Sequence, residues 1–308
     1  MQSNGRVNIV VAHGLESKPL IQLFDLQKQE AATAYPVYEN DTGIALIVSG
    51  IGKPAAAKAT NYLATLQAQK DTDFCAWLNI GIAGHRTAEL GSAFLVHKII
   101  DLATGESYYP SLLVRAVASE TERTTGREST QKSTTQFETT SVVTVEKIER
   151  DYPEDAVYEM EAFGFYSSAT RLVTAELIQV YKVISDNSAN PVENIDFARV
   201  RQWIAGQGES IARLVNRLAE LAQEYNTCYR LPPEFGILCA ETRLTATQKV
   251  QLKRLCQRYY ALERQTELQS FIACPNRSGR TLIQALESGL HFDSDSKLDP
   301  KVNFPEIR

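Results

Sequence analysis

Four carboxylates stand out in the sequence because of their apolar surroundings. Glu159 and Glu161 lie on either side of Met160 in the stretch DAVYEMEAFGFYSSATRL, Glu16 follows the apolar run VNIVVAHG, and Asp186 follows LIQVYKVIS. Carboxylates that share a partly dry site push their pKa values apart, so that one group holds a proton while another is ionised near neutral pH. The pattern is typical of acid/base chemistry, in which each positioned proton transfer contributes about 10²–10⁴ in rate.

The chemistry that such a group of acids favours is cleavage of a glycosidic bond. A neutral carboxylic acid can protonate the leaving group, and an ionised one can activate water or bind hydroxyls at an oxocarbenium-like transition state. Taken singly, each of these acids is explained equally well as a helix cap or a solvated surface charge. Their common position after apolar runs is what favours a shared site.

The elements that must position these acids alternate between strands and helices. The sequence predicts strands at 7–14, 43–52, 74–84, 93–103, 142–146 and 177–187, and helices at 17–29, 53–68 and 194–225. This alternation predicts an α/β sheet with helices on both faces, and in such sheets ligands lie at the carboxyl ends of strands. We therefore expect the segments just past the strand ends to converge on one crevice: 13–16, 49–53, 81–86 and 185–187.

The composition excludes few functions. The chain has 308 residues, 44% hydrophobic and 22% charged, with a net charge of −5. Clustered Lys and Arg are what phosphate binding requires, so the acidic balance argues against nucleic acid as a partner. The apolar run near the N-terminus is too short for a signal peptide, and no run approaches the roughly 18 residues that cross a bilayer. We expect a cytoplasmic protein without a membrane partner.

The cysteines give no sign of a metal site. They show no CxxC or His-paired spacing, and their positions are Cys75, Cys228, Cys239, Cys256 and Cys274. An odd number of unpatterned cysteines is typical of reduced thiols. We expect no metal and no cofactor.

Motifs in the first two thirds of the chain resemble those of the nucleoside phosphorylase/nucleosidase family. They are VSGIGKPAAAKAT (48–60), NIGIAG (79–84), AVYEMEAFG (156–164) and VISDN (183–187). The resemblance covers about residues 7–225 and is greater to the hydrolytic branch, the methylthioadenosine/S-adenosylhomocysteine nucleosidases and futalosine hydrolases. It implies a three-layer α/β fold with a mixed central sheet flanked by helices. It also implies a small-molecule nucleoside substrate and a homodimer or larger homo-oligomer with sites near a subunit contact.

The resemblance assigns roles at the base and the sugar. Asp186 resembles the acid that protonates and holds the purine, and Ser185 lies beside it at the substrate. Glu161 matches the acid that binds the ribose hydroxyls, and Met160 would pack against the sugar. Glu159 resembles a companion acid with a structural role.

The resemblance also assigns the groups around the attacking water. Glu16 occupies the place of the general base in nucleosidases, and Lys182 lies where they carry an arginine. A cation there would help to keep Glu16 ionised. Ala83 and Gly84 would lie against the base, because small residues let the backbone approach the ring.

Departures from the family pattern leave three functions open. Asn79 stands where phosphorylases generally carry a phosphate-holding arginine, and it lacks the permanent charge that phosphate recognition favours. This favours hydrolysis by a nucleosidase. A phosphorylase, and thus a glycosyltransferase, would need Arg86 or an arginine of a neighbouring subunit as an alternative anion ligand. Ile82 replaces the usual serine of the glycine turn, which leaves a non-catalytic nucleoside-binding protein as the third alternative.

The division into domains is predicted at residue 225. Residues 1–225 carry the family motifs, and residues 226–308 form a mainly helical extension with predicted helices at 245–263 and 278–292. The 14-residue linker between these two helices is too long for a helix-turn-helix motif. We expect the extension to pack on the core of its own or a partner chain. Residues 120–140, rich in Thr, Ser and charge, predict an exposed loop or hairpin.

Overall fold

The computed structural model describes residues 5–68, 74–113, 137–229, 231–272 and 278–291. The chain divides into two compact units, Met1–Asn226 and Thr227–Arg308. Each unit has its own buried apolar core, so each is described separately. The predicted loop at 120–140 lies, up to residue 136, outside the described residues.

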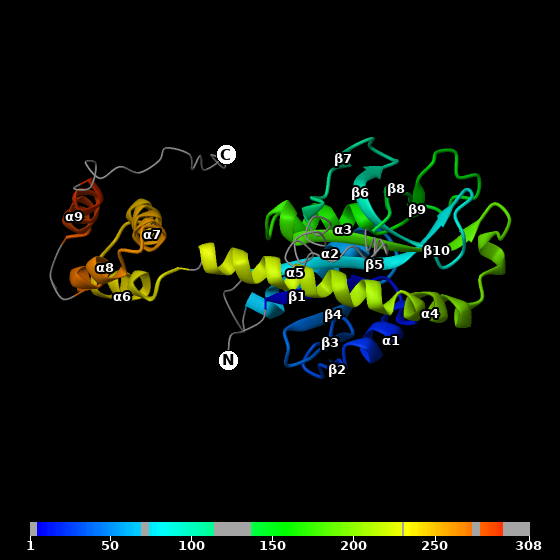
Figure 1. Ribbon diagram of the computed structural model, residues 1–308, viewed down its shortest axis with the longest axis horizontal. Helices are drawn as coiled ribbons and strands as arrows, with labels where there is room; N and C mark the ends of the chain where they lie inside the picture. Colours follow the sequence, from blue (N-terminus) through cyan, green and yellow to red (C-terminus); the bar gives the residue numbers. More distant parts are fainter. Residues whose placement is uncertain (1–4, 69–73, 114–136, 230, 273–277, 292–308) are drawn as a thin grey trace, which may run out of the picture. The chain divides into compact units, whose positions relative to one another are not determined.

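The first unit is built on one mixed sheet (Figure 1). Its strands follow one another along the chain: β1 (Arg6–Val11), β2 (Gln27–Lys28), β3 (Val37–Glu39), β4 (Ile44–Val48), β5 (Cys75–His85), β6 (Ala93–Asp101), β7 (Ser107–Tyr108), β8 (Thr139–Thr144), β9 (Val157–Glu159) and β10 (Ile178–Asn187). Strand β1 pairs in parallel with β4 and β5, whereas β10 pairs in parallel with β5 and antiparallel with β6. The sheet is therefore mixed, as the family resemblance predicts.

Part of the sheet closes on itself. Strand β5 pairs with β10, β10 with β6, β6 with β8, β8 with β9, and β9 returns to β5. The long strand β5 makes this possible, because its first half pairs with β1 and its last residues, Gly84 and His85, pair with β9. The closure brings the start of β9 and the end of β10 to the C-terminal end of β5.

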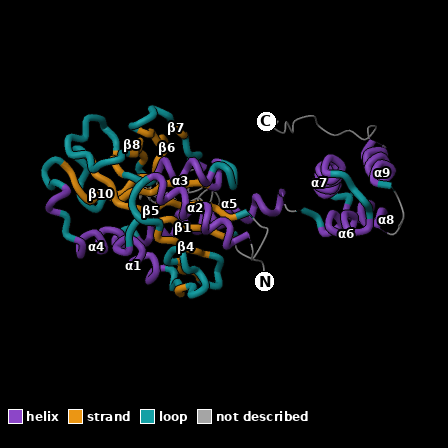
Figure 2. Tube along the Cα trace, turned by 180° about the vertical axis from the view of Figure 1, so that it is seen from behind, coloured by secondary structure: helices purple, strands orange, loops and turns teal. Residues whose placement is uncertain are grey.

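Helices cover both faces of the sheet. The helices of this unit are α1 (Gly14–Leu23), α2 (Lys53–Ala68), α3 (Ala162–Ala169), α4 (Phe197–Gly206) and α5 (Gly208–Tyr229), with short 3-10 turns η2 (Ala175–Leu177) and η3 (Val192–Asn194). Figure 1 shows α5 lying along one face, and Figure 2, the view from behind, shows α2 and α3 on the other. The unit therefore has three layers, which confirms the predicted fold class.

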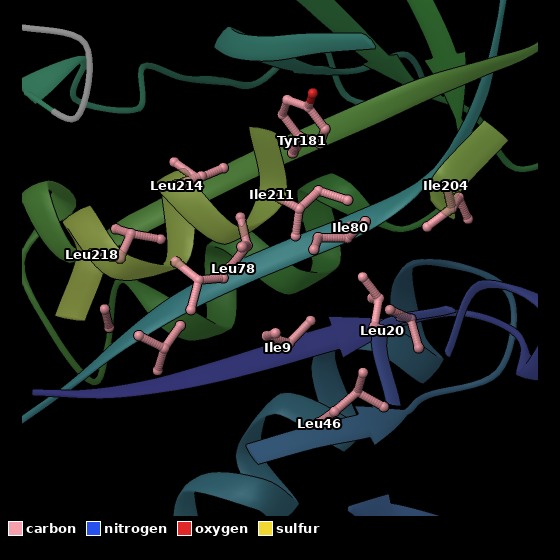
Figure 3. Close-up of a cluster of buried hydrophobic side chains, with 14 of the residues drawn as sticks. Ile9, Leu20, Leu46, Leu78, Ile80, Tyr181, Ile204, Ile211, Leu214 and Leu218 are labelled. Carbon is pink, nitrogen blue, oxygen red and sulfur yellow. The ribbon is translucent and has the colours of Figure 1, made fainter. Parts of the chain in front are cut away.

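The strands alternate between two cores because successive side chains of a strand point to opposite faces. On β1, Ile9 faces α5 whereas Val10 joins the core under α2 and α3. Figure 3 shows the first of these cores, in which Ile9, Leu46, Leu78 and Ile80 from three strands meet helical side chains. The helical partners labelled there are Leu20, Ile204, Ile211, Leu214 and Leu218.

The prediction of one continuous helix over 194–225 is wrong, because the structure has two helices, α4 and α5, that are separated at Gln207. The side chain of Gln207 explains the break. Its Nε2 donates to the carbonyl of Gly91 at 2.8 Å, and its Oε1 accepts from the Tyr181 hydroxyl at 3.0 Å. Through these two hydrogen bonds, Gln207 connects the junction of α4 and α5 to Tyr181 on β10, the strand that carries Asp186, and to Gly91.

The second unit is a small helical bundle. Its helices are α6 (Pro233–Glu241), α7 (Ala246–Ala261), α8 (Gln265–Ile272) and α9 (Gly279–His291). The sequence predicts α7 and α9, and the segment predicted as a linker between them contains α8. Most apolar side chains of the segment are buried among themselves, including Leu238, Leu252 and Leu286. These side chains therefore form a hydrophobic core within the second unit itself.

No helix in the described ranges is long and apolar enough to cross a membrane.

The contact between α2 and α3 generates a test of the fold. A Cβ added to Gly164 would lie 2.0 Å from the carbonyl oxygen of Lys53. We expect Gly164→Ala to push the two helices apart and to lower the free energy of unfolding by about 1–3 kcal/mol. Urea unfolding followed by tryptophan fluorescence measures this, because both tryptophans, Trp77 and Trp203, lie in the first unit.

The matched control is Gly206→Ala at the end of α4. A Cβ there would meet nothing within 4 Å, and alanine is favoured over glycine in a helix by about 0.5–1 kcal/mol. The control should therefore be neutral or stabilising. Equal stability of the two variants would contradict the tight α2–α3 contact.

Candidate active site

A cavity of about 590 Å³ lies where the closed part of the sheet meets α1, η3 and the start of α4. Four carboxylates singled out in the sequence line it: Glu16, Glu159, Glu161 and Asp186. All four are at least nine-tenths buried. The predicted neighbours Met160, Ala83, Gly84 and Ser185 also line the cavity.

Glu16 lies in the first turn of α1 and is held by backbone donors. Its Oε2 accepts from the backbone N–H groups of Ala12 and His13, each at 2.8 Å, and its Oε1 accepts from that of Ile82 at 3.0 Å. Burial raises the pKa of Glu16, although these hydrogen bonds and the charge of Lys182 oppose the rise. The group therefore has an increased affinity for protons while its orientation is fixed.

Glu159 is held by partners at both carboxylate oxygens. Its Oε1 accepts from the hydroxyl of Thr144 at 2.6 Å, and its Oε2 accepts from the backbone N–H groups of Glu161 and Ala162 at 2.9 and 2.8 Å. The Nζ of Lys182, whose side chain has no exposed surface, lies 2.8 Å from the same Oε2. Lys182 thus pairs directly with Glu159, and it acts on Glu16 only through its charge.

Glu161 occupies the N-cap position of α3 and lies one residue beyond Met160. Its Oε1 accepts from the backbone N–H of Gly52 at 2.7 Å. Burial, followed by the charge of Glu159, raises the pKa of Glu161 to about 7. The Gly52 amide reaches it from the VSGIG turn, where Gly52 has a φ of +101°, in the left-handed region that favours glycine.

Asp186 is held by two hydroxyl groups. The hydroxyl of Ser185 donates to its Oδ1, and the hydroxyl of Tyr152 donates to its Oδ2. A β-bulge between Ile184 and Asp186 in the pairing with β5 places Asp186 beside Gly84. A Cβ at Gly84 would lie 2.5 Å from the Oδ2 of Asp186, so only glycine fits there.

The two residues considered as phosphate ligands do not line the cavity. The exposed Arg86 donates from Nε to the carbonyl of Tyr152 at 2.8 Å and from Nη2 to the carbonyl of Pro153. The buried Asn79 donates to the carbonyl of Val10 at 3.0 Å. In this structure both side chains hold backbone segments together, and their role toward an anion remains only a prediction.

Sequence reasoning missed two kinds of cavity residue. The first is Tyr152, whose partner Asp186 lies 34 positions away in the chain, so no local pattern reveals the contact. The second is the apolar rim, where Ile148 and Phe197 line the cavity although each is more than half exposed. For Tyr152, the signal in the sequence is the Tyr-Pro pair at 152–153, which indicates a turn.

Within the described ranges, no group of three or more His, Cys, Asp and Glu side chains is arranged to hold a metal ion. What the cavity offers chemically is a set of buried carboxylates, with raised proton affinity at Glu16 and Glu161.

The raised pKa of Glu161 predicts a pH dependence of stability. Its pKa rises from 4.5 to about 7 on folding, so the folded state keeps a proton that the unfolded state releases in this range. The contribution of Glu161 to stability is therefore full below about pH 4.5 and is lost as the pH rises through about 7. We expect the stability of the wild type relative to Glu161→Gln to fall over this window.

The measurement is urea unfolding of both proteins at several pH values. Glutamine keeps the acceptor for Gly52 but cannot titrate, so the difference between the two proteins isolates the ionisation of Glu161. A difference that does not change with pH would contradict the raised pKa.

Comparisons with known proteins find solved structures of similar fold that cover about 70% of this chain. No protein-family model matches the chain, and no curated protein does. The native futalosine hydrolase of Helicobacter pylori strain 26695 is 14% identical, covering 69% of this chain and 97% of that chain, with a TM-score of 0.52. The 5′-methylthioadenosine nucleosidase of Arabidopsis thaliana, in apo form, is 15% identical, covering 70% and 96%, also with a TM-score of 0.52.

A third similar structure is the 5′-methylthioadenosine/S-adenosylhomocysteine nucleosidase of Neisseria meningitidis in complex with methylthio-immucillin-A. It is 17% identical, covering 70% of this chain and 99% of that chain, with a TM-score of 0.50. At such identities the likeness is one of fold. It confirms the resemblance indicated by the motifs at that level: this chain contains a unit with the fold of the methylthioadenosine nucleosidases and futalosine hydrolase, followed by helices that they lack.

Proposed function

We propose that the cavity is the active site of an N-ribosyl hydrolase that cleaves the glycosidic bond of a purine nucleoside, with or without a modified 5′ group. One observation carries the proposal. Glu16, Glu161 and Asp186 come from three distant segments, all are buried, and all line one cavity. The fold supports it, because the similar solved structures bear the names of nucleosidases and a futalosine hydrolase.

The base would bind at Asp186. Ala83 and Gly84 line the cavity next to it, and the ring of Tyr152 lies over Gly84. In the proposed reaction the carboxyl group of Asp186 gives its proton to a ring nitrogen of the base. The glycosidic bond then breaks, and its electron pair leaves with the base, which the added proton has made a better leaving group.

The sugar would bind at Glu161 and Met160. Near neutral pH the Glu161 carboxyl lies close to its titration midpoint, and in its ionised form it can accept hydrogen bonds from ribose hydroxyls. These bonds strengthen as the sugar gains positive charge, which lowers the energy of the transition state more than that of the bound substrate. The side chain of Met160, half-buried at the cavity wall, offers the sugar an apolar surface.

Water would be activated at Glu16. Its Oε1 accepts a single backbone hydrogen bond in the structure, so a lone pair remains for a water molecule. The raised pKa of Glu16 suits a general base that works near neutral pH. The water oxygen bonds to the anomeric carbon, its proton passes to Glu16, and Glu16 and Asp186 then exchange protons with solvent to complete the cycle.

Hydrolysis is favoured over phosphorolysis by the charges in the cavity. Among the described residues that line it, none is lysine or arginine. A phosphate dianion would have to bind beside buried carboxylates without a direct cationic partner, whereas phosphate recognition depends on such partners. Neutral water meets no such barrier.

The proposal is tested by base release from a panel of nucleosides. The panel pairs adenine with hypoxanthine as the base, and a free 5′-hydroxyl with a 5′-methylthio group as the substituent. We expect release of free base from at least one member, followed by chromatography. Binding of a nucleoside without any release of base would support the non-catalytic alternative instead.

Asp186→Asn tests the role of the proton donor. The substitution keeps the shape of the side chain and removes its transferable proton, so we expect kcat to fall by about 10²-fold or more. Asp41→Asn, which removes an exposed carboxylate far from the cavity lining, is the control and should keep full turnover. An Asp186→Asn variant that retains more than about a tenth of wild-type turnover would rule out proton transfer by Asp186.

A further inference from the structure

Tyr152 is a buried cavity residue for which the reaction outlined above has no use. Its side chain is 2% exposed, it lines the cavity, and its hydroxyl donates to the Oδ2 of Asp186. The Oδ1 of the same carboxylate accepts from the hydroxyl of Ser185. With one hydroxyl donor at each oxygen, the plane of the Asp186 carboxylate is fixed from both ends.

The backbone at Tyr152 is unusual and is held from outside. Tyr152 has a φ of +44°, a conformation that costs energy for a residue other than glycine, and such strain gathers at functional sites. Arg86 donates to the carbonyl oxygens of Tyr152 and Pro153, which fixes the backbone directly after the Cα of the strained residue. The guanidinium of Arg86 thus holds the backbone that places the Tyr152 hydroxyl.

The ring of Tyr152 is fixed as well. It packs on Tyr158, with ring centroids 5.7 Å apart and planes tilted by 60°. On another side it lies over Gly84, where a Cβ would come within 2.5 Å of the ring carbon Cε1. The same glycine therefore makes room for both Tyr152 and Asp186.

We propose that Tyr152 is a positioning residue that orients Asp186 for proton transfer to the base, and that Arg86 keeps Tyr152 in place for this task. The proposal rests on the proposed function of the cavity. Tyr152 keeps its own proton throughout: burial, followed by the hydrogen bond to Asp186, raises the pKa of Tyr152 above its usual value of 10. It is therefore a hydrogen-bond donor near neutral pH and not a base.

Other charged groups near Tyr152 strengthen this donor role. Glu149 and Glu193 both line the cavity, and their charges raise the pKa of Tyr152 further. Glu193 is paired with Arg150 at 2.7 Å. On β5, the Nε2 of His85 lies 3.3 Å from Asp155, and its Nδ1 accepts from the backbone N–H groups of Thr87 and Ala88. The hydroxyls of Ser185 and Tyr152 remain the two direct donors to Asp186 among the described residues.

The test compares Tyr152→Phe with Tyr181→Phe. Both substitutions remove only a hydroxyl from a buried tyrosine; that of Tyr181 binds Gln207 and lies outside the cavity lining. We expect Tyr152→Phe to lower kcat by about tenfold or more, because the proton-donating carboxyl group loses a hydrogen bond that fixes its orientation, with KM changed by less than about threefold. Tyr181→Phe controls for the general effect of losing a buried hydroxyl and should keep its kcat.

A second readout does not depend on activity. A hydroxyl proton held between Tyr152 and Asp186 should give a protected, downfield proton resonance in the wild type and in Tyr181→Phe. The resonance should be lost in Tyr152→Phe and in Asp186→Asn. Arg86→Ala, which changes an exposed side chain, should weaken the resonance and lower kcat, because the strained turn loses its support.

The outcomes separate this inference from the proposed function. A folded Tyr152→Phe variant with wild-type kcat, or the same resonance in wild type and Tyr152→Phe, would overturn the positioning role. An unchanged Arg86→Ala would overturn the role of Arg86. A wild-type protein that releases no base would overturn the proposed function and with it the catalytic purpose of the contact, while the resonance would still report whether Tyr152 holds Asp186.

Discussion

The buried ion pair between Lys182 and Glu159 is the interaction on which the rest of the site depends. Removing one partner of such a pair costs about 3–5 kcal/mol, because the other charge is left without compensation. Glu159 also accepts from Thr144 at the end of β8 and from the backbone at the start of α3. One carboxylate therefore joins three strands and a helix at the point where the sheet closes, and it fixes the start of the helix that presents Glu161.

Burial raises the proton affinity of the cavity carboxylates, and the charges of the same ion pair modify it. Lys182 is a buried cation near three buried carboxylates, and its direct partner is Glu159. Burial, followed by the negative charge of the neighbouring Glu159, raises the pKa of Glu161 to about 7. Glu16, partly compensated by three backbone N–H groups, also has a raised pKa. The fold thus keeps protons available near neutral pH, which acid/base cleavage of a glycosidic bond requires.

Much of this could be predicted from the sequence, because continuous apolar runs identify buried strands and the carboxyl ends of parallel strands meet at one edge of a sheet. Glu16 and Asp186 were found in this way, and both line the cavity. The role of Tyr152 could not be predicted, because its position depends on a residue with positive φ whose carbonyl is bound by Arg86, from the end of another strand. The break at Gln207 could not be predicted either, because it depends on contacts with Gly91 and Tyr181, which are distant in the sequence. The direct partner of Lys182 was also missed, because every residue of β10 is buried and periodicity gives no direction.

The central claim is that water, and not phosphate, attacks the sugar in a cavity without a lysine or arginine among its described lining residues. The most direct measurement is phosphorus NMR of the reaction in excess phosphate, with the free base followed in parallel. The account predicts that free base accumulates while inorganic phosphate remains the only phosphorus signal. Sugar 1-phosphate as the main product would contradict it.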